Sequence, residues 1–436
     1  MAPDPSIMQA VERLDYRVTV GDVASQAGLN VNLAQQGLLA LASEAGGHLQ
    51  VAESGEVVYL FPQNFRTVLR QKYLRLQLQA WWNKVWKVLF YLIRISFGIV
   101  LMVSIALILL TIVFIMAAAS SSRDNDDRQG SGDIFMPTGW LGPDFFWFFS
   151  PGYYDHPRQR RRQFSRYDDK PKLNFLESIF SFLFGDGNPN ADLEERRWQT
   201  IGTVIRNERG AVVAEQIAPY LDKIGEGYSR EYEEYMLPVL TQFNGQPEVS
   251  PEGGIVYRFP ELQATAAQTR PKPVPAYFQE FPWRFSQAGS GQIIAAIGLG
   301  GVNLVGALAL GKLLADGTAA ATIGGLVAFV QSIYWLLLSY GSAFLALPLI
   351  RYFWIQWRNR KIAARNETRQ EYAVQLNQAD TKLQSKIAYA QQFAAETVIG
   401  TDDLAYTTER DLLEQDVEQA DKIDAEWQRR LDQKRL

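Results

Sequence analysis

Side chains able to do chemistry are scarce in this chain of 436 residues. It contains no cysteine, which excludes disulfides, thiolate zinc sites, iron–sulfur ligation through thiolates and cysteine nucleophiles. Its two histidines are His48 and His156, so histidine-based metal or acid–base chemistry is also poorly supported. Glu231, Glu233 and Glu234 could suggest a divalent-cation site, but such a run on a helix is usually a solvated face. The sequence therefore predicts no enzyme activity, no catalytic residue, no metal site and no cofactor.

Two basic clusters suggest a different chemistry, the binding of anionic groups. One lies between residues 66 and 94, where lysine and arginine alternate with tryptophan and leucine, and the other lies between residues 156 and 172. Such side chains suit the headgroup region of a membrane. Because Phe164 and Tyr167 interrupt the second cluster, nucleic-acid binding is the alternative there. The predicted lipid-headgroup contacts are Lys84, Lys87, Arg158, Arg160, Arg161 and Arg162.

Three runs without a charged side chain are long enough to cross a bilayer: residues 95–122, 285–311 and 317–350. The last two are separated by five residues, which predicts a transmembrane helical hairpin over 285–350. The first predicts one span within 66–122, after a basic amphipathic helix. The first five residues lack the basic and apolar regions of a secretory signal, so we expect insertion to depend on the internal spans.

Small residues recur at four-residue spacing in the predicted hairpin, a pattern that lets membrane helices approach closely. Asn303 is polar within its apolar run, and both an interhelical hydrogen bond and a permeation pathway are open roles for it. Because neither run contains Asp, Glu, Lys or Arg, a proton-coupled transporter is disfavoured. The predicted helix-packing residues are Ala296, Gly300, Asn303, Ala307, Gly311, Gly324, Ala328 and Ser332.

The chain contains an internal repeat. Residues 10–65 are predicted to form helix, turn, helix and hairpin, which is the order of a winged helix, and residues 191–262 repeat this pattern. Residues 245–260 align without gaps to residues 47–62 at a constant offset of 198, and further upstream Gly210 is matched to Gly21. The repeated wing residues are Val58, Tyr59, Phe61, Pro62, Val256, Tyr257, Phe259 and Pro260.

The charge of both copies argues against nucleic acid. Residues 18–65 contain no lysine or arginine, and residues 211–257 contain two cations against eight acids. Affinity for a duplex comes largely from cations that neutralise phosphates. We therefore expect no nucleic acid partner, and a membrane-tethered transcription regulator is disfavoured.

The remaining segments connect these parts. Residues 123–190 form an aromatic and basic interfacial segment, residues 263–284 a proline-rich linker, and residues 351–436 a charged tail. From residue 362 the tail contains no proline and one glycine, Gly400. We expect long helices on both sides of Gly400, in a helical hairpin or coiled coil. The predicted fold class is thus an α-helical integral membrane protein with two winged-helix-like α+β modules and this C-terminal helical hairpin or coiled coil.

The membrane topology stays open at this stage. Basic flanks at 66–94, 158–172 and 351–369 all favour the cytoplasmic side, and three crossings cannot satisfy them together. Either the aromatic residues 134–154 help the chain to return, or the first module lies on the opposite face from the second.

With its repeated Val-Tyr-x-Phe-Pro wings, glycine-rich hairpin and charged tail, the whole chain resembles a family of uncharacterised membrane proteins of cyanobacteria and of the chloroplast envelope. The resemblance implies a cyanobacterial plasma or thylakoid membrane, or the chloroplast envelope, with most soluble parts on the cytoplasmic or stromal side. Plant members sometimes carry a label linking them to iron–sulfur cluster biosynthesis. Since this chain has no cysteine, that label is not carried over as chemistry.

Our functional hypothesis is a non-enzymatic membrane scaffold or adaptor. Its partners would be membrane lipid, unidentified proteins held by the acidic modules and the tail, and, in a homo-oligomer, further copies of the chain. The alternative is an auxiliary subunit of a transporter or small channel built on the glycine-rich hairpin. Replacing Gly300 and Gly311 with leucine would separate the two, because a conduit should lose flux while its partners remain bound.

Overall fold

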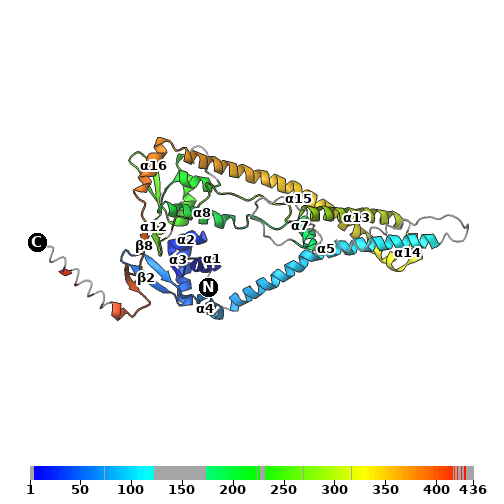
Figure 1. Cartoon of the computed structure of the whole chain (residues 1–436), viewed down its shortest axis with the longest axis horizontal. Coiled ribbons are helices and arrows are strands. Elements are labelled where there is room, and N and C mark those ends of the chain that lie inside the picture. The colour runs from blue at the N-terminus through cyan, green and yellow to red at the C-terminus, as the bar shows by residue number, and fades with distance from the viewer. Residues whose placement is uncertain are drawn as a thin grey trace, which may run out of the picture. The chain divides into compact units, whose positions relative to one another are not determined.

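A computed structural model describes the chain from residue 4 to 415, except 73, 122–172, 223, 226–230, 269 and 316, together with scattered positions beyond 415. The chain is mostly helical with small antiparallel sheets (Figure 1). It divides into two compact units. The module unit contains residues 1–82, 190–281 and 361–436, and the helical unit contains residues 83–189 and 282–360.

Module 1 follows the order helix, strand, helix, helix, strand, strand (Figure 1). Its elements are α1 (Pro5–Arg13), β1 (Arg17–Thr19), α2 (Val20–Ala27), α3 (Val31–Ala45), β2 (His48–Ala52) and β3 (Val57–Leu60). A capping box begins α2, because Thr19 and Asp22 each accept a hydrogen bond from the other's backbone N–H. Glycine ends α2 and α3 in the left-handed conformation, with φ of 67° at Gly28 and 70° at Gly46.

Module 2 repeats this order with shorter helices after its first strand. Its elements are α8 (Leu193–Asn207), β4 (Ala211–Val213), α9 (Ala214–Ile217), η1 (Ala218–Tyr220), η2 (Glu234–Met236), α11 (Leu237–Phe243), β5 (Gln246–Val249) and β6 (Ile255–Arg258). The register is the same in both sheets, since Arg17 pairs with Leu60 and Ala211 with Arg258.

The structure corrects the upstream match between the two copies. The N–H of Phe61 donates to the carbonyl of Tyr16, and the N–H of Phe259 donates to the carbonyl of Gly210, each at 2.8 Å. Gly210 therefore corresponds to Tyr16 and not to Gly21. Both residues have a left-handed φ, of 66° and 75°, so glycine supplies in one copy a conformation that tyrosine adopts in the other.

The repeat has a glycine at the same position in both copies, Gly47 and Gly245, because a side chain there would meet a phenylalanine ring. A Cβ atom on Gly47 would lie 2.9 Å from the ring of Phe61, and one on Gly245 would lie 2.4 Å from the ring of Phe259. The wing phenylalanine therefore packs on bare backbone in both copies.

The two modules pack against each other through α2 and α8 and share one apolar core. A Cβ atom on Gly28 would lie 2.7 Å from the carbonyl oxygen of Glu195, and one on Gly202 would lie 3.0 Å from Ser25. Modules in such close contact cannot lie on opposite faces of a membrane. This finding overturns the alternative that placed the first module on the opposite face.

The tail adds to both modules. After α15 (Gly325–Asn377) come α16 (Thr381–Gln391), β8 (Thr397–Val398) and β9 (Leu404–Thr407). Strand β8 pairs in parallel with β7 (Ala264–Thr265), which follows α12 (Pro260–Gln263), and β9 extends the sheet of module 1 to the order β1-β3-β2-β9.

The tail is helical up to residue 391, as predicted, in the end of α15 and in α16. The expected helices next to Gly400, and the helical hairpin or coiled coil, are wrong for the described part of the tail. Two strands occupy this region instead. The apolar side chains of α16 pack on the sheet of module 2, through Val213 and Val256, rather than on another tail helix. An apolar stripe shows that a helix is covered, but it does not specify by what.

Buried charges fix α15 to the linker, through Glu280, and to module 2, through Asp222. Arg365 donates to both carboxylate oxygens of Glu280, at 2.7 and 2.5 Å, and Arg369 donates to Glu280 at 2.7 Å and also to Asp222. The exposed fractions of Arg369 and Glu280 are only 1% and 3%. Burial raises the pKa of Glu280, but the hydrogen bonds and charges of the two arginines outweigh it and lower that pKa below its ordinary value.

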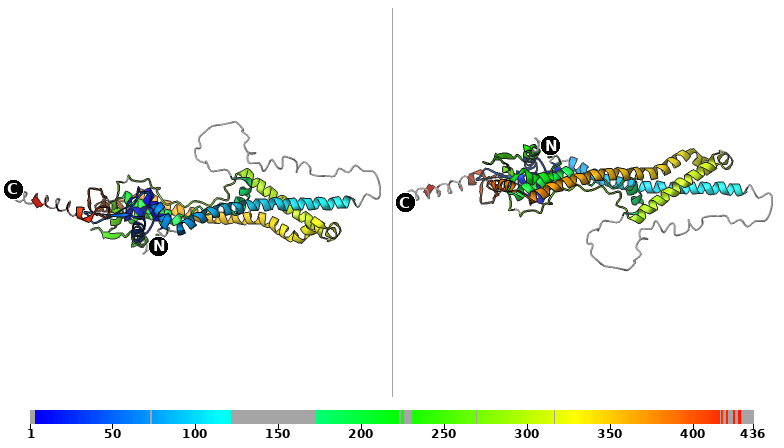
Figure 2. Two further views of the ribbon diagram at one scale, coloured as in Figure 1. Left: turned by 90° about the horizontal axis from the view of Figure 1, so that it is seen from below. Right: turned by 90° about the horizontal axis from the view of Figure 1, so that it is seen from above.

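The helical unit contains helices that could cross a membrane. Three helical segments of the described chain are long and apolar enough: Trp81–Ser120 of α5 (Leu74–Ser121), Ser290–Leu314 (α13) and Gly325–Asn377 (α15). Figure 2 shows α5, in blue to cyan, as one continuous helix after the short α4 (Phe65–Lys72). The shorter α7 (Phe175–Phe184) packs against α13.

The second hairpin helix begins later than predicted. Residues 318–323 form a separate helix, α14 (Thr318–Ile323), and α15 starts only at Gly325. Gly324 and Gly325 both have a positive φ, of 62° and 52°, which interrupts the helix.

Candidate functional site

The repeated wing residues form the module core. Val58, Tyr59, Phe61, Val256, Tyr257 and Phe259 are buried, and Pro62 and Pro260 are half-buried. Burial raises the pKa of Tyr59, and burial with the nearby Glu233 raises that of Tyr257, so both phenols stay protonated. These residues hold the wings in place and do not line an open site.

Five of the predicted membrane-packing residues lie at helix contacts. Ala296, Asn303 and Ala307 are fully buried. A Cβ atom on Gly300 would lie 2.6 Å from the ring of Phe344, and one on Gly311 would lie 2.0 Å from the hydroxyl of Tyr334. Here α13 supplies the small residue and α15 the large one.

The structure corrects the other three packing residues. Gly324 lies in the break before α15, and no atom comes within 4 Å of a Cβ placed on it. Ala328 and Ser332 are exposed, and the Ser332 hydroxyl donates to the carbonyl of Phe329 in its own helix at 2.6 Å. The buried face of α15 near these residues consists instead of Val327, Val330 and Leu337. Spacing showed which residues share a face but not which face is covered.

Asn303 joins two helices. Its Nδ2 donates to the Oγ of Ser104 on α5 at 2.8 Å, and both residues are buried. This is the interhelical hydrogen bond that was one of its two open roles.

The predicted lipid contacts fall in two groups. Lys84 and Lys87 are exposed on α5, close to the exposed Trp81 and Trp86. Arg158, Arg160, Arg161 and Arg162 lie outside the described residues, as does most of the predicted 123–190 segment.

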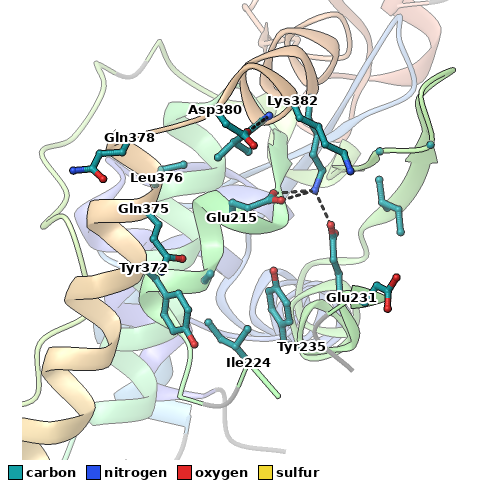
Figure 3. Close-up of a pocket in the computed structure, with 17 residues that line it drawn as sticks. Glu215, Ile224, Glu231, Tyr235, Tyr372, Gln375, Leu376, Gln378, Asp380 and Lys382 are labelled. Atoms are coloured by element: carbon teal, nitrogen blue, oxygen red, sulfur yellow. Dashed lines mark hydrogen bonds and ion pairs between the residues drawn. The ribbon is translucent and has the colours of Figure 1, made fainter. Parts of the chain in front are cut away.

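A cavity of about 600 Å³ lies between module 2, the end of α15 and the start of α16 (Figure 3). Its lining combines apolar and aromatic side chains with polar ones. Among the lining residues are Ile224, Tyr235, Tyr372, Gln375, Leu376, Gln378 and Leu383. The charged lining residues are Glu215, Glu231, Glu233, Asp380, Lys382 and Lys386, which together carry a net charge of −2.

The centre of this site is a charge network that connects three elements. The Nζ of Lys386 on α16 donates to both carboxylate oxygens of Glu215, at 3.0 and 2.8 Å, and to Glu233 at 2.6 Å (Figure 3). The hydroxyl of Tyr257 donates to the other oxygen of Glu233 at 2.9 Å. Glu233 reaches this position from a left-handed backbone conformation, with φ of 54°.

The charged groups of this arrangement are largely paired with one another. Lys386 is neutralised by two carboxylates, and Asp380 caps α16 by accepting from the N–H of Leu383 at 2.8 Å. Within the described residues, no group of three or more His, Cys, Asp or Glu side chains could hold a metal ion. The cavity suits a cationic or polar group that the remaining negative charge would attract.

Sequence reasoning missed this network. It treated Glu233 as part of a solvated acidic face, whereas the structure half-buries that residue against Lys386 and Tyr257. Glu231 is exposed at the cavity, as a solvated face predicts. Lys386 is 153 residues from Glu233 along the chain, and no local pattern signals such a pairing.

Comparison with known proteins gives one relative. A protein of Arabidopsis thaliana named "Uncharacterized protein At5g03900, chloroplastic" is 39% identical to this chain over 436 residues, which covers 97% of this chain and 81% of the relative. This chain belongs to the family of that protein. The expected resemblance to a chloroplast protein family is confirmed to that extent, and the relative's name mentions no iron–sulfur cluster. No family model matches the chain, and no solved structure matches it.

Proposed function

We propose that this protein is a non-enzymatic integral-membrane scaffold that holds protein partners through module 1. We interpret modules 1 and 2 as winged-helix-like, which puts α3 in the position of a recognition helix. The observation that carries the proposal is the uncharged exposed face of α3. The one charged residue of α3, Glu44, is half-buried, whereas the exposed fractions of Leu33 and Leu39 are 58% and 44%.

Such a face suits a protein partner. Nucleic-acid binding requires cations on the reading helix, whereas exposed leucines beside uncharged polar side chains resemble the core of a protein interface. The rest of the exposed face consists of Asn32, Gln35, Gln36, Ala40 and Ser43.

The membrane role has separate support. The relative is named chloroplastic, and three helical segments could cross a membrane. We propose a plastid or cyanobacterial membrane, with both modules on the cytoplasmic or stromal side and with Lys84 and Lys87 at the lipid headgroups. Homo-oligomers are part of this proposal.

Affinity purification of the tagged full-length protein in mild detergent, with quantitative mass spectrometry, tests the scaffold role. The test variant combines Leu33→Glu with Leu39→Glu. The control combines Leu412→Glu with Leu413→Glu, because these tail leucines are 58% and 74% exposed and receive the same added charge. We expect partners to fall at least about tenfold with the test variant and to remain with the control, since a lost apolar anchor costs about 2 kcal/mol or more.

Two outcomes would contradict the proposal. The same partners at the same level in both variants would show that α3 is not the binding face. A homo-oligomer without partners, whose ion flux is lost when Gly311 is replaced by leucine, would support the channel or transporter subunit instead.

A further inference from the structure

A second cavity, of about 660 Å³, lies where four parts of the module unit meet. Module 1 contributes residues of α2, and module 2 contributes residues of α8 and Arg209. The linker contributes residues 268 and 270–272, and the tail contributes Glu396. No charged group of the network around Lys386 lines this cavity.

The charge of this cavity is opposite to that of the first. Its cations are Arg206, Arg209, Arg270 and Lys272, and its acids are Asp22 and Glu396, so the lining carries a net charge of +2. A concave surface of one sign concentrates the potential and attracts counter-ions.

Asp22 has little capacity left to neutralise these cations. It accepts from the N–H groups of Thr19 and Ala266, at 2.9 and 3.0 Å, and from the hydroxyl of Thr265 at 3.0 Å. It also pairs with one terminal nitrogen of Arg206 at 2.6 Å. Four partners therefore share its two oxygens.

Donors remain free around the cavity. The Nε of Arg206 is buried and has no partner. Arg209 and Arg270 are exposed and form no ion pair with any residue that the structure describes. Lys272 donates to Gln26, an uncharged amide, at 3.0 Å.

We infer that this cavity binds a small anion through a phosphate group. Guanidinium groups bind phosphate oxygens in a bidentate manner, and three of them line one cavity together with an ammonium group. The phosphate could belong to a free soluble anion or to a lipid headgroup. The inference does not depend on the scaffold role, because it uses no residue of the α3 face.

Calorimetric titration of the full-length protein in nanodiscs of phosphatidylcholine with inorganic pyrophosphate tests the inference. The test variant combines Arg209→Gln with Arg270→Gln, which are exposed positions outside the core. The control combines Arg13→Gln with Arg410→Gln, which removes the same charge from exposed positions of the module unit that line neither cavity. We expect the test variant to weaken pyrophosphate binding at least about tenfold and the control to change it less than about twofold.

The same titration in nanodiscs containing phosphatidylglycerol separates the two sources of phosphate. If the wild type binds pyrophosphate with the same affinity in both kinds of nanodisc, the result supports a free anion. If it binds pyrophosphate more weakly in phosphatidylglycerol than in phosphatidylcholine, the result supports competition from the headgroup. Absence of pyrophosphate binding, or equal weakening in both double variants, would overturn the inference. Thermal unfolding of each variant without ligand shows whether a loss of binding reflects a loss of fold.

Discussion

Modules 1 and 2 share one chain path but use equivalent positions differently. Asp22 and Gln216 both occupy the third position of the helix after the first strand, and each accepts from the N–H three residues earlier, at 2.9 and 3.0 Å. Only Asp22 also binds Arg206 of module 2 and, in the linker that follows module 2, Thr265 and Ala266. The cap maintains the fold in both copies, and the carboxylate of module 1 has the added role of joining the modules.

The second position of the same helix, Gly21 in module 1 and Glu215 in module 2, also differs in role between the two copies. A Cβ atom on Gly21 would lie 1.9 Å from the carbonyl oxygen of Glu261, so only glycine lets α12 approach module 1 this closely. In module 2 the equivalent residue is Glu215, which binds Lys386 of α16. One repeated position thus serves module packing in one copy and attachment of the tail in the other.

The sheet edges differ as well. In module 1 the tail strand β9 covers β2, where the N–H of Leu49 donates to the hydroxyl of Thr408 at 2.9 Å. In module 2 no described strand pairs with the outer edge of β5, and Pro247 takes the position of Leu49. Because proline has no N–H, this edge resists pairing with a further strand.

The largest effect is expected from removing the carboxylate that joins the modules. Replacing Asp22 with alanine leaves Arg206 without its carboxylate and two N–H groups without their acceptor, so the free energy of unfolding should fall by about 3–5 kcal/mol. Replacing Gln216 with alanine removes only a cap and should cost about 1 kcal/mol. Chemical unfolding of the full-length protein in detergent, followed by circular dichroism, measures both, and equal losses would refute the comparison.

The next effect concerns how the linker after module 2 is held to α15. Because the pKa of Glu280 is lowered in the folded protein, its carboxylate contributes stability that is present above the ordinary value of 4.5 and is lost as the pH falls through its lowered pKa. Glu280→Gln should therefore lower the free energy of unfolding at pH 7 by about 3 kcal/mol, which chemical unfolding measures as a lower midpoint.

The pH dependence provides the control for this prediction. The difference between wild type and Glu280→Gln should shrink as the pH falls below 4.5, while other carboxylates affect both proteins alike. A difference that stays constant from pH 7 to pH 3.5 would show that the charge of Glu280 is not what holds α15.

A smaller and local effect should follow from uncovering the edge of module 1. Tyr406 pairs with Val51, and Tyr406→Pro removes a backbone donor from β9. Amide hydrogen exchange in β2 should rise about tenfold or more, while exchange in β5 stays unchanged. The matched control Tyr406→Thr keeps the N–H and should leave β2 protected, and faster exchange in that control as well would implicate the side chain instead.

The smallest effect concerns the edge of module 2. Pro247→Thr restores an N–H on β5 and should promote concentration-dependent association, with a change in stability below about 0.5 kcal/mol. Light scattering after gel filtration would detect it. Pro251→Thr, in the turn between β5 and β6, is the matched control, and association caused equally by both variants would argue against strand pairing.

The sequence by itself determined the features that depend on local patterns. The uncharged runs 95–122 and 285–311 correspond to apolar parts of α5 and α13, because apolar composition over some 20 residues is a local property. The register of the two wings could also be predicted, since Gly47 and Gly245 mark the same close approach of a phenylalanine.

Only the tertiary structure decided which distant groups meet. Residues 404–407 became a strand because β2 had an open edge, and Lys386 found Glu215 from 171 residues away. Likewise the four-residue spacing of Ala328 and Ser332 could not show that Val327 and Val330 form the covered face. A strand edge, a carboxylate or a helix face pairs with whichever distant group the folded modules and helices bring beside it. Local spacing in the sequence does not specify that partner.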